Sequence, residues 1–137
     1  DMINGLPFKE NSFDLIINFE TIKYLPIEQG RKMLSQIRRI LNNDGQLYIS
    51  TTHHTEREEF VESIPFTEFN EWLTEAGFNI IEQFGSQATW EDISKHLKRK
   101  HKKIAAELLQ YHPPEMVAAM LAPFYPEIAT QMTWWCE

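Results

Sequence analysis

Two short apolar runs flank one long amphipathic segment between residues 13 and 51, and few residues connect the three. The first run, residues 13–18, has a polar residue near each end, as in a strand buried on both faces of a parallel sheet. Residues 26–42 repeat apolar side chains at helical spacing, and residues 46–51 are typical of a second strand. The tight joints predict a right-handed β–α–β unit, and therefore an α/β fold with a mainly parallel sheet.

Two further elements follow in the middle of the chain. The first helix is expected to stop at Asn42-Asn43-Asp44-Gly45, with Gly45 at a positive φ. A second helix is expected over residues 67–76, with Thr67 as its N-cap and Gly77 at its end. A third strand is expected over residues 79–84.

The C-terminal part is predicted to be mostly helical. Thr89 is a suitable cap for a helix of about five turns over residues 90–111, because apolar side chains continue on one face at helical spacing. A shorter helix is expected over residues 114–122. Residues 132–136 predict a last strand, placed antiparallel at an edge of the sheet.

Composition limits the class of protein. The chain has 20 acidic and 13 basic side chains and a formal net charge of −7, which argues against general nucleic-acid binding. The single cysteine, Cys136, excludes an internal disulfide and a cysteine-based zinc site. The longest apolar stretch is far shorter than the roughly 20 residues that cross a bilayer, so we expect a cytoplasmic protein without a membrane contact. Residue 1 is not a methionine, so we also expect an upstream segment.

Several short motifs occur in a fixed order along residues 1 to about 84. They are Leu6-Pro7-Phe8, Ser12-Phe13-Asp14, Tyr24-Leu25, Ile37-Arg38-Arg39-Ile40-Leu41, Asn43-Asp44-Gly45 and Glu75-Ala76-Gly77-Phe78. In this order and spacing the segment resembles the class I S-adenosylmethionine-dependent methyltransferases. In that family an aspartate and a Leu-Pro-Phe loop precede the fourth strand, which Ser-Phe-Asp opens.

The resemblance implies the C-terminal half of a Rossmann-like methyltransferase sheet, with strands four to seven and a helical insertion before the last strand. Residues 1–84 would form the core and residues 132–137 the final edge strand. Residues 85–131 match nothing general in the family; we expect them to form a helical cap that selects the substrate. The implied cofactor is S-adenosyl-L-methionine. The family's glycine-rich loop and its ribose-binding acidic residue would lie upstream of residue 1, since the chain has five glycines and no G-x-G pattern. We therefore expect the chain alone to be inactive.

The resemblance also implies four cofactor-binding positions. Asp1 would accept a hydrogen bond from the adenine amino group, and Met2 would offer a backbone N–H and an apolar wall. Asn18 and Phe19 would meet the methionine part of the cofactor, mainly through their backbone. Without the resemblance, Asp1 is simply a frayed terminal residue.

Candidate catalytic side chains follow the two predicted strands, because open α/β sheets place ligands at the carboxyl ends of their strands. Glu20 could orient an ammonium group, or it could be a solvent-facing carboxylate. Tyr24 stands where many family members carry histidine, and packing at the turn is its alternative role. His53 and His54 are the pair suited to acid–base chemistry near neutral pH, with solvated loop histidines as the alternative. The sequence has no helical histidine pair, so we expect no metal site.

The leading functional hypothesis is methyl transfer to a small molecule. The basic run at residues 95–103 raises the alternative of an RNA- or nucleotide-directed methyltransferase, although its helical spacing favours a solvated helix face. A third hypothesis is a non-catalytic interaction module that keeps the scaffold. The edge left unpaired at the first strand would favour self-association.

Overall fold

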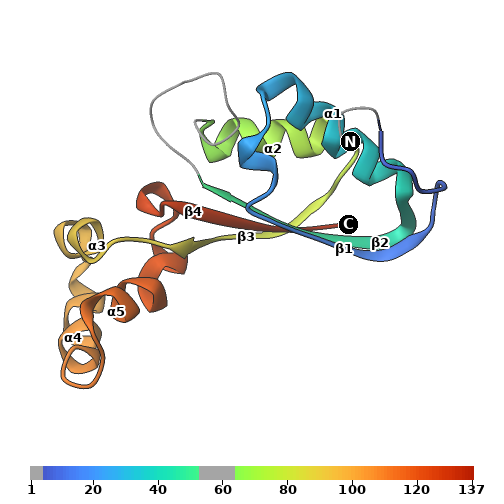
Figure 1. The fold of residues 1–137 in the computed structure, drawn as a ribbon. Coiled ribbons are helices and arrows are strands. Elements are labelled where there is room, and N and C mark those ends of the chain that lie inside the picture. The colour runs from blue at the N-terminus through green and yellow to red at the C-terminus, as the bar shows by residue number, and fades with distance from the viewer. Residues whose placement is uncertain (1–4, 53–63) are drawn as a thin grey trace. The chain divides into compact units, whose positions relative to one another are not determined.

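A computed structural model describes residues 5–52 and 64–137 of the chain (Figure 1). By its backbone contacts the chain divides into two compact units, the first formed by Asp1–Gln83 with Thr133–Glu137 and the second by Phe84–Met132. The strands are β1 (Phe13–Phe19), β2 (Leu41–Thr52), β3 (Ile80–Gln87) and β4 (Gln131–Cys136). The α-helices are α1 (Ile27–Ile40), α2 (Phe66–Glu75), α3 (Trp90–His96), α4 (Arg99–Leu108) and α5 (Pro114–Leu121). Short 3-10 helices are η2 (Ile22–Tyr24), η4 (Ala122–Phe124) and η5 (Pro126–Ile128).

The four strands form one mixed sheet in the order β1-β2-β4-β3. β1 and β2 are parallel, which confirms the β–α–β unit predicted from the sequence. β3 and β4 are antiparallel, since Asn79 and Glu137 exchange both backbone hydrogen bonds, at 2.7 and 3.0 Å. The prediction that the last strand lies at an edge is wrong, because β4 lies between β2 and β3. A strand at this place buries most of its residues, which accounts for the apolar, tryptophan-rich sequence of β4.

The first unit has its core between the sheet and the helices α1 and α2, which lie together on one face in Figure 1. The amphipathic pattern that predicts α1 is the reason, because its apolar stripe is the buried one. The fully buried side chains of this core include Leu34, Ile37, Leu47, Ile49, Phe69, Leu73 and Trp134. The indole N–H of Trp134 donates to Asn70 Oδ1 at 2.6 Å, so the largest of them buries no unpaired polar group.

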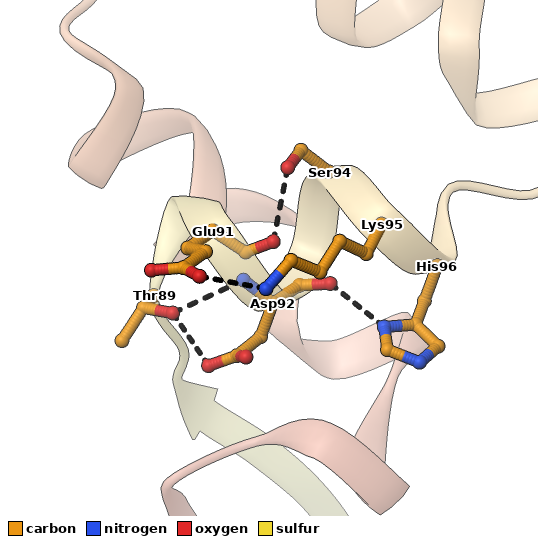
Figure 2. A network of polar contacts seen from close by, with 6 residues as sticks. All are labelled: Thr89, Glu91, Asp92, Ser94, Lys95 and His96. Atoms are coloured by element: carbon orange, nitrogen blue, oxygen red, sulfur yellow. Dashed lines mark hydrogen bonds and ion pairs between the residues drawn. The ribbon is translucent and has the colours of Figure 1, made fainter.

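The second unit is a separate helical cluster with its own core. Ile93, Ala105, Val117, Leu121 and Tyr125 are among the buried residues there. Figure 2 shows how α3 begins: Thr89 Oγ1 accepts a hydrogen bond from the backbone N–H of Asp92 at 3.2 Å, which confirms the predicted cap. Lys95 pairs with Glu91 one turn earlier, at 2.6 Å.

The predicted helix over residues 90–111 is wrong in one respect, since it breaks at Leu97 and Lys98 into α3 and α4. Lys98 is extended, with ψ 148°, and its backbone N–H donates to the hydroxyl of Tyr125 at 2.8 Å. The break changes the helical phase, so His101 and Ala105 face the core and Ile104 is exposed.

Two predictions at helix ends are also wrong. Gly45 does not have a positive φ; β2 begins directly at Leu41, and a side chain at Gly45 would lie 2.7 Å from Leu41 Cγ. Close approach is therefore the reason for glycine at this position. Thr67 does not cap α2, because the helix begins at Phe66, after Pro65. Gly77, by contrast, has the positive φ expected after a helix, +89°.

Candidate cofactor site at the carboxyl end of β1

The parallel strands β1 and β2 end side by side, with Phe19 opposite Ser50. In open α/β sheets the crevice at the carboxyl ends of the strands is where ligands bind. The turn that follows β1 carries Glu20, Thr21 and η2. The candidate site is therefore built from this turn and from the last residues of the two strands.

Asn18 is the polar residue that the strand buries at this end. Its side chain is only 8% exposed, and its Oδ1 has no hydrogen-bond partner in the described part of the chain. An unpaired buried acceptor costs about 1–3 kcal/mol, so a ligand or another chain segment that donates to it would be stabilised there. Asn18 also lines a cavity of about 330 Å³ along β1 and α1.

The lining of this cavity shows which groups suit it. Besides Asn18, all of the lining side chains are apolar: Leu6, Phe8, Phe13, Leu15, Ile16, Ile17, Met33, Ile37 and Ile40. The carbonyl oxygen of Asn18 fits an ammonium group or an amide N–H, such as the amino-acid end of S-adenosylmethionine. The rest of the lining is apolar, so it does not suit ribose hydroxyls and fits packing by apolar side chains.

Phe19 and Tyr24 extend from the same turn into solvent. Their side chains are 58% and 69% exposed. The Phe19 carbonyl accepts a hydrogen bond from Thr21 Oγ1 at 3.2 Å, which holds the backbone just after the strand. The exposure of Tyr24 argues against the alternative role of packing at the turn, and the ammonium of Lys23 lies 5.1 Å from the centroid of its ring.

Glu20 is fixed at three points. Its backbone N–H donates to the Ser50 carbonyl at 3.1 Å, and its Oε1 accepts from Ser50 Oγ at 2.9 Å. Its Oε2 pairs with Lys23 Nζ, also at 2.9 Å. The hydrogen bond to Glu20 raises the pKa of Lys23, so this lysine keeps its charge throughout the neutral range.

Sequence reasoning did not identify Ser50 and Lys23 as parts of this site. Ser50 could have been found from its place at the end of a strand, where a buried hydroxyl needs a partner. Asp1, Met2, His53 and His54 lie outside the described residues. Within residues 5–52 and 64–137 no three histidine, cysteine or acidic side chains gather as a metal site requires, and no helix there is long and apolar enough to span a membrane.

Comparison with known proteins identifies the fold. Residues 1–49 match a family model described as a methyltransferase domain. An uncharacterised protein of Haemophilus influenzae is 29% identical over 98 residues, which are 61% of this chain and 39% of that protein.

Solved structures agree over nearly the whole chain. An S-adenosylmethionine-dependent methyltransferase from Mesorhizobium loti is 12% identical, with a TM-score of 0.56 over 99% of this chain and 66% of its own. A Haloferax volcanii methyltransferase complex with the Trm112 activator is 21% identical, with a TM-score of 0.55 over 98% and 57%. The cyclase SpnF is 14% identical, with a TM-score of 0.57 over 97% and 53%.

The chain therefore has the Rossmann-like fold of the class I S-adenosylmethionine-dependent methyltransferases. It spans between about half and two-thirds of the length of these structural neighbours, and less of the curated relative. Because a cyclase shares the fold, the fold by itself does not fix the reaction.

Proposed function

We propose that these residues are the downstream half of a methyltransferase catalytic domain, which transfers a methyl group from S-adenosylmethionine to a small-molecule acceptor. The observation that carries the proposal is the match of residues 1–49 to the methyltransferase-domain family. These residues include β1 and its carboxyl end, where the buried Oδ1 of Asn18 lacks a partner within residues 5–52 and 64–137. We also propose that residues 85–131 form a cap that selects the substrate. The proposed location of the protein is the cytoplasm.

The residues of this chain would hold the cofactor at four positions. Asp1 would accept from the adenine amino group, and Met2 would cover the ring. Asn18 and Phe19 would hold the amino-acid end, the first through its carbonyl oxygen and the second through its backbone. When bound, the cofactor would supply an electrophilic methyl group on its sulfonium: the acceptor would bond to the methyl carbon as the carbon–sulfur bond breaks, and S-adenosylhomocysteine would leave with that electron pair.

An acceptor that loses a proton needs a group to take it. His53 and His54 remain the proposed bases, because an imidazole titrates near neutral pH. Tyr24 stays a candidate as well, since its side chain is exposed and a ligand can approach it. Both carboxylate oxygens of Glu20 already have partners in Ser50 and Lys23, so Glu20 is the weakest of the four candidates for proton transfer.

The acceptor class is testable without knowing the acceptor. A longer version of the protein, extended upstream of Asp1, is incubated with S-adenosylmethionine and either a low-mass metabolite fraction or total RNA. S-adenosylhomocysteine formation is then measured. We expect turnover with the metabolites and none with RNA; turnover with RNA alone would contradict the small-molecule acceptor.

One observation favours the RNA-directed alternative. Arg99, Lys100, Lys102 and Lys103 on α4 are exposed, and none of them forms an ion pair within the described part of the chain. Such unpaired cations are what phosphate contacts require. If RNA is the substrate, reversing the charge of Lys98, Arg99 and Lys102 should weaken RNA binding steeply with salt. Lys95, which Glu91 already pairs, is the matched control, and equal effects of the two changes would remove this alternative.

A further inference from the structure

Glu20 has a backbone conformation that glutamate rarely adopts. Its φ is +57°, in the left-handed region, where a Cβ atom meets the following carbonyl and where glycine or asparagine is the usual choice. Such conformations persist only where surrounding contacts enforce them, and they are concentrated at functional sites. Contacts of the glutamate side chain must therefore offset the cost of this backbone conformation.

The Glu20 side chain makes such contacts with two neighbouring elements, β2 and η2. Ser50 belongs to β2, so the backbone and Oγ contacts with Ser50 tie the turn to the end of the adjacent strand. Lys23 belongs to η2, so the ion pair ties the turn to the element that follows. The side chains of Lys23 and Glu20 are 18% and 28% exposed, which limits the screening of this pair by salt.

The contacts of Glu20 with Ser50 and Lys23 form a clamp on the turn after β1. The residues next to this clamp are the ones that face the candidate cofactor site. Asn18 and Phe19 come immediately before Glu20, and the direction of their backbone depends on how the chain turns after β1. Asn18 is enclosed, yet its Oδ1 has no hydrogen-bond donor among the residues that the structure describes. Pre-organised acceptors bind more tightly because less ordering remains to be done when the ligand arrives.

We propose that Glu20 is a positioning residue, whose contacts with Ser50 and Lys23 hold the left-handed turn after β1 and thereby aim Asn18 and Phe19 at the amino-acid end of the cofactor. This inference rests on the proposed function and deepens it. It assigns to Glu20 a role other than contact with an ammonium group or proton transfer.

The variant Glu20→Gly distinguishes an effect of Glu20 on cofactor binding from an effect on the stability of the fold. Glu20→Gly removes the carboxylate and also removes the backbone penalty, so the two effects on stability oppose each other. In the longer protein extended upstream of Asp1, we expect the urea midpoint to stay close to that of the native protein. The affinity for S-adenosylhomocysteine, measured by calorimetric titration, should fall at least about tenfold, the loss typical of a hydrogen bond to a charged group. Glu20→Gln keeps an oxygen that can accept from Ser50 Oγ and should recover part of the affinity.

Asn11→Gly is the matched control. Asn11 also has a positive φ, 51°, but it precedes β1 at the opposite end of the strand. This variant should bind S-adenosylhomocysteine like the native protein. Unchanged affinity in Glu20→Gly, or a loss fully explained by less folded protein, would overturn the proposal.

Hydrogen exchange distinguishes this proposal from the proposed function, because it needs no cofactor. In the 137-residue chain, Ser50→Ala and Glu20→Gly should lower the protection of the amide at position 20, which donates to the Ser50 carbonyl. If protection falls but the native longer protein binds no cofactor, the proposed function fails while the clamp stands. If protection is unchanged, the clamp itself is refuted.

Discussion

At the scale of single residues, His101 shows how a buried titratable group depends on its surroundings. Its Nδ1 lies 2.7 Å from the Tyr125 hydroxyl, which itself accepts the backbone N–H of Lys98. The hydroxyl can therefore donate its own proton to Nδ1, an arrangement that suits a neutral imidazole with its proton on Nε2. Burial lowers the pKa of His101, and the charges of Lys100 and Lys98 lower it further.

This arrangement predicts a loss of stability in mild acid. A histidine whose pKa is lowered by folding binds more protons in the unfolded state, so the free energy of unfolding falls as the pH drops through about 6.5 toward the folded value. Urea denaturation at pH 7 and at pH 5 measures the change. His101→Gln, whose amide oxygen can accept from Tyr125, should reduce the dependence on pH. An equal dependence in both proteins would contradict the assignment.

Tyr125 has a second, pH-independent effect. Tyr125→Phe leaves the Lys98 N–H and the His101 nitrogen without their partner while keeping the apolar ring. We expect a destabilisation of about 1–3 kcal/mol at pH 7, the usual cost of leaving buried polar groups unpaired. Chemical denaturation gives the value, and Tyr111→Phe, at an exposed tyrosine of the same unit, is the control. A stability equal to that of the control would show that the hydroxyl is not needed.

The sequence predicted the structural role of a residue well where neighbouring residues determine that role, and poorly where distant residues do. Thr89 caps α3 and Gly77 follows α2 as expected, because both effects depend on neighbours within a few positions. Gly45 is required by a close approach to Leu41, and no turn rule reveals that. The unpaired oxygen of Asn18 and the clamp on Glu20 depend on how strands β1 and β2 align, so the sequence could name both residues but not their contacts.

At the scale of elements, β1 has an unpaired edge and an uncovered face. Among the strands of residues 5–52 and 64–137 it pairs with β2 alone, and Leu15 and Ile17 on one face are 50% and 58% exposed. Unpaired N–H and C=O groups beside exposed apolar side chains are a template for a further strand. In a solution of the purified chain, a second copy of the same chain is available to pair with this edge.

We therefore expect the 137-residue chain to self-associate as its concentration rises. Ile17→Lys places a charge on the exposed face of β1 and should shift the population toward monomer without destabilising the fold, since Ile17 is already more than half exposed. Size-exclusion chromatography with light scattering measures the mass. Lys32→Glu, an exposed charge change on α1, is the control. A chain that remains monomeric at all concentrations would show that the edge does not pair.

Whether a segment is a helix or a strand was predictable, because periodicity and turn residues decide it. Where a helix is interrupted was not predictable. The break between α3 and α4 depends on a hydroxyl 27 residues further along the chain, which replaces a helical acceptor. The place of β4 inside the sheet depends on strand order, which a single short apolar run does not encode.

At the scale of the whole molecule, several features of the first unit gather beside β1. The apolar cavity beside β1, its free edge and the unpaired oxygen of Asn18 lie on the same side of the first unit. The structural neighbours with the same fold are up to about twice as long as this chain. Together these features agree with the proposal that another segment packs against β1 in the catalytic domain and supplies the rest of the cofactor site.

The measurement that tests this most directly is calorimetric titration of S-adenosylhomocysteine into two proteins: the 137-residue chain and a version extended upstream of Asp1. The account predicts saturable one-to-one binding to the extended protein and no measurable binding to the shorter one. Absence of binding to the extended protein, with its fold intact by circular dichroism, would contradict the account.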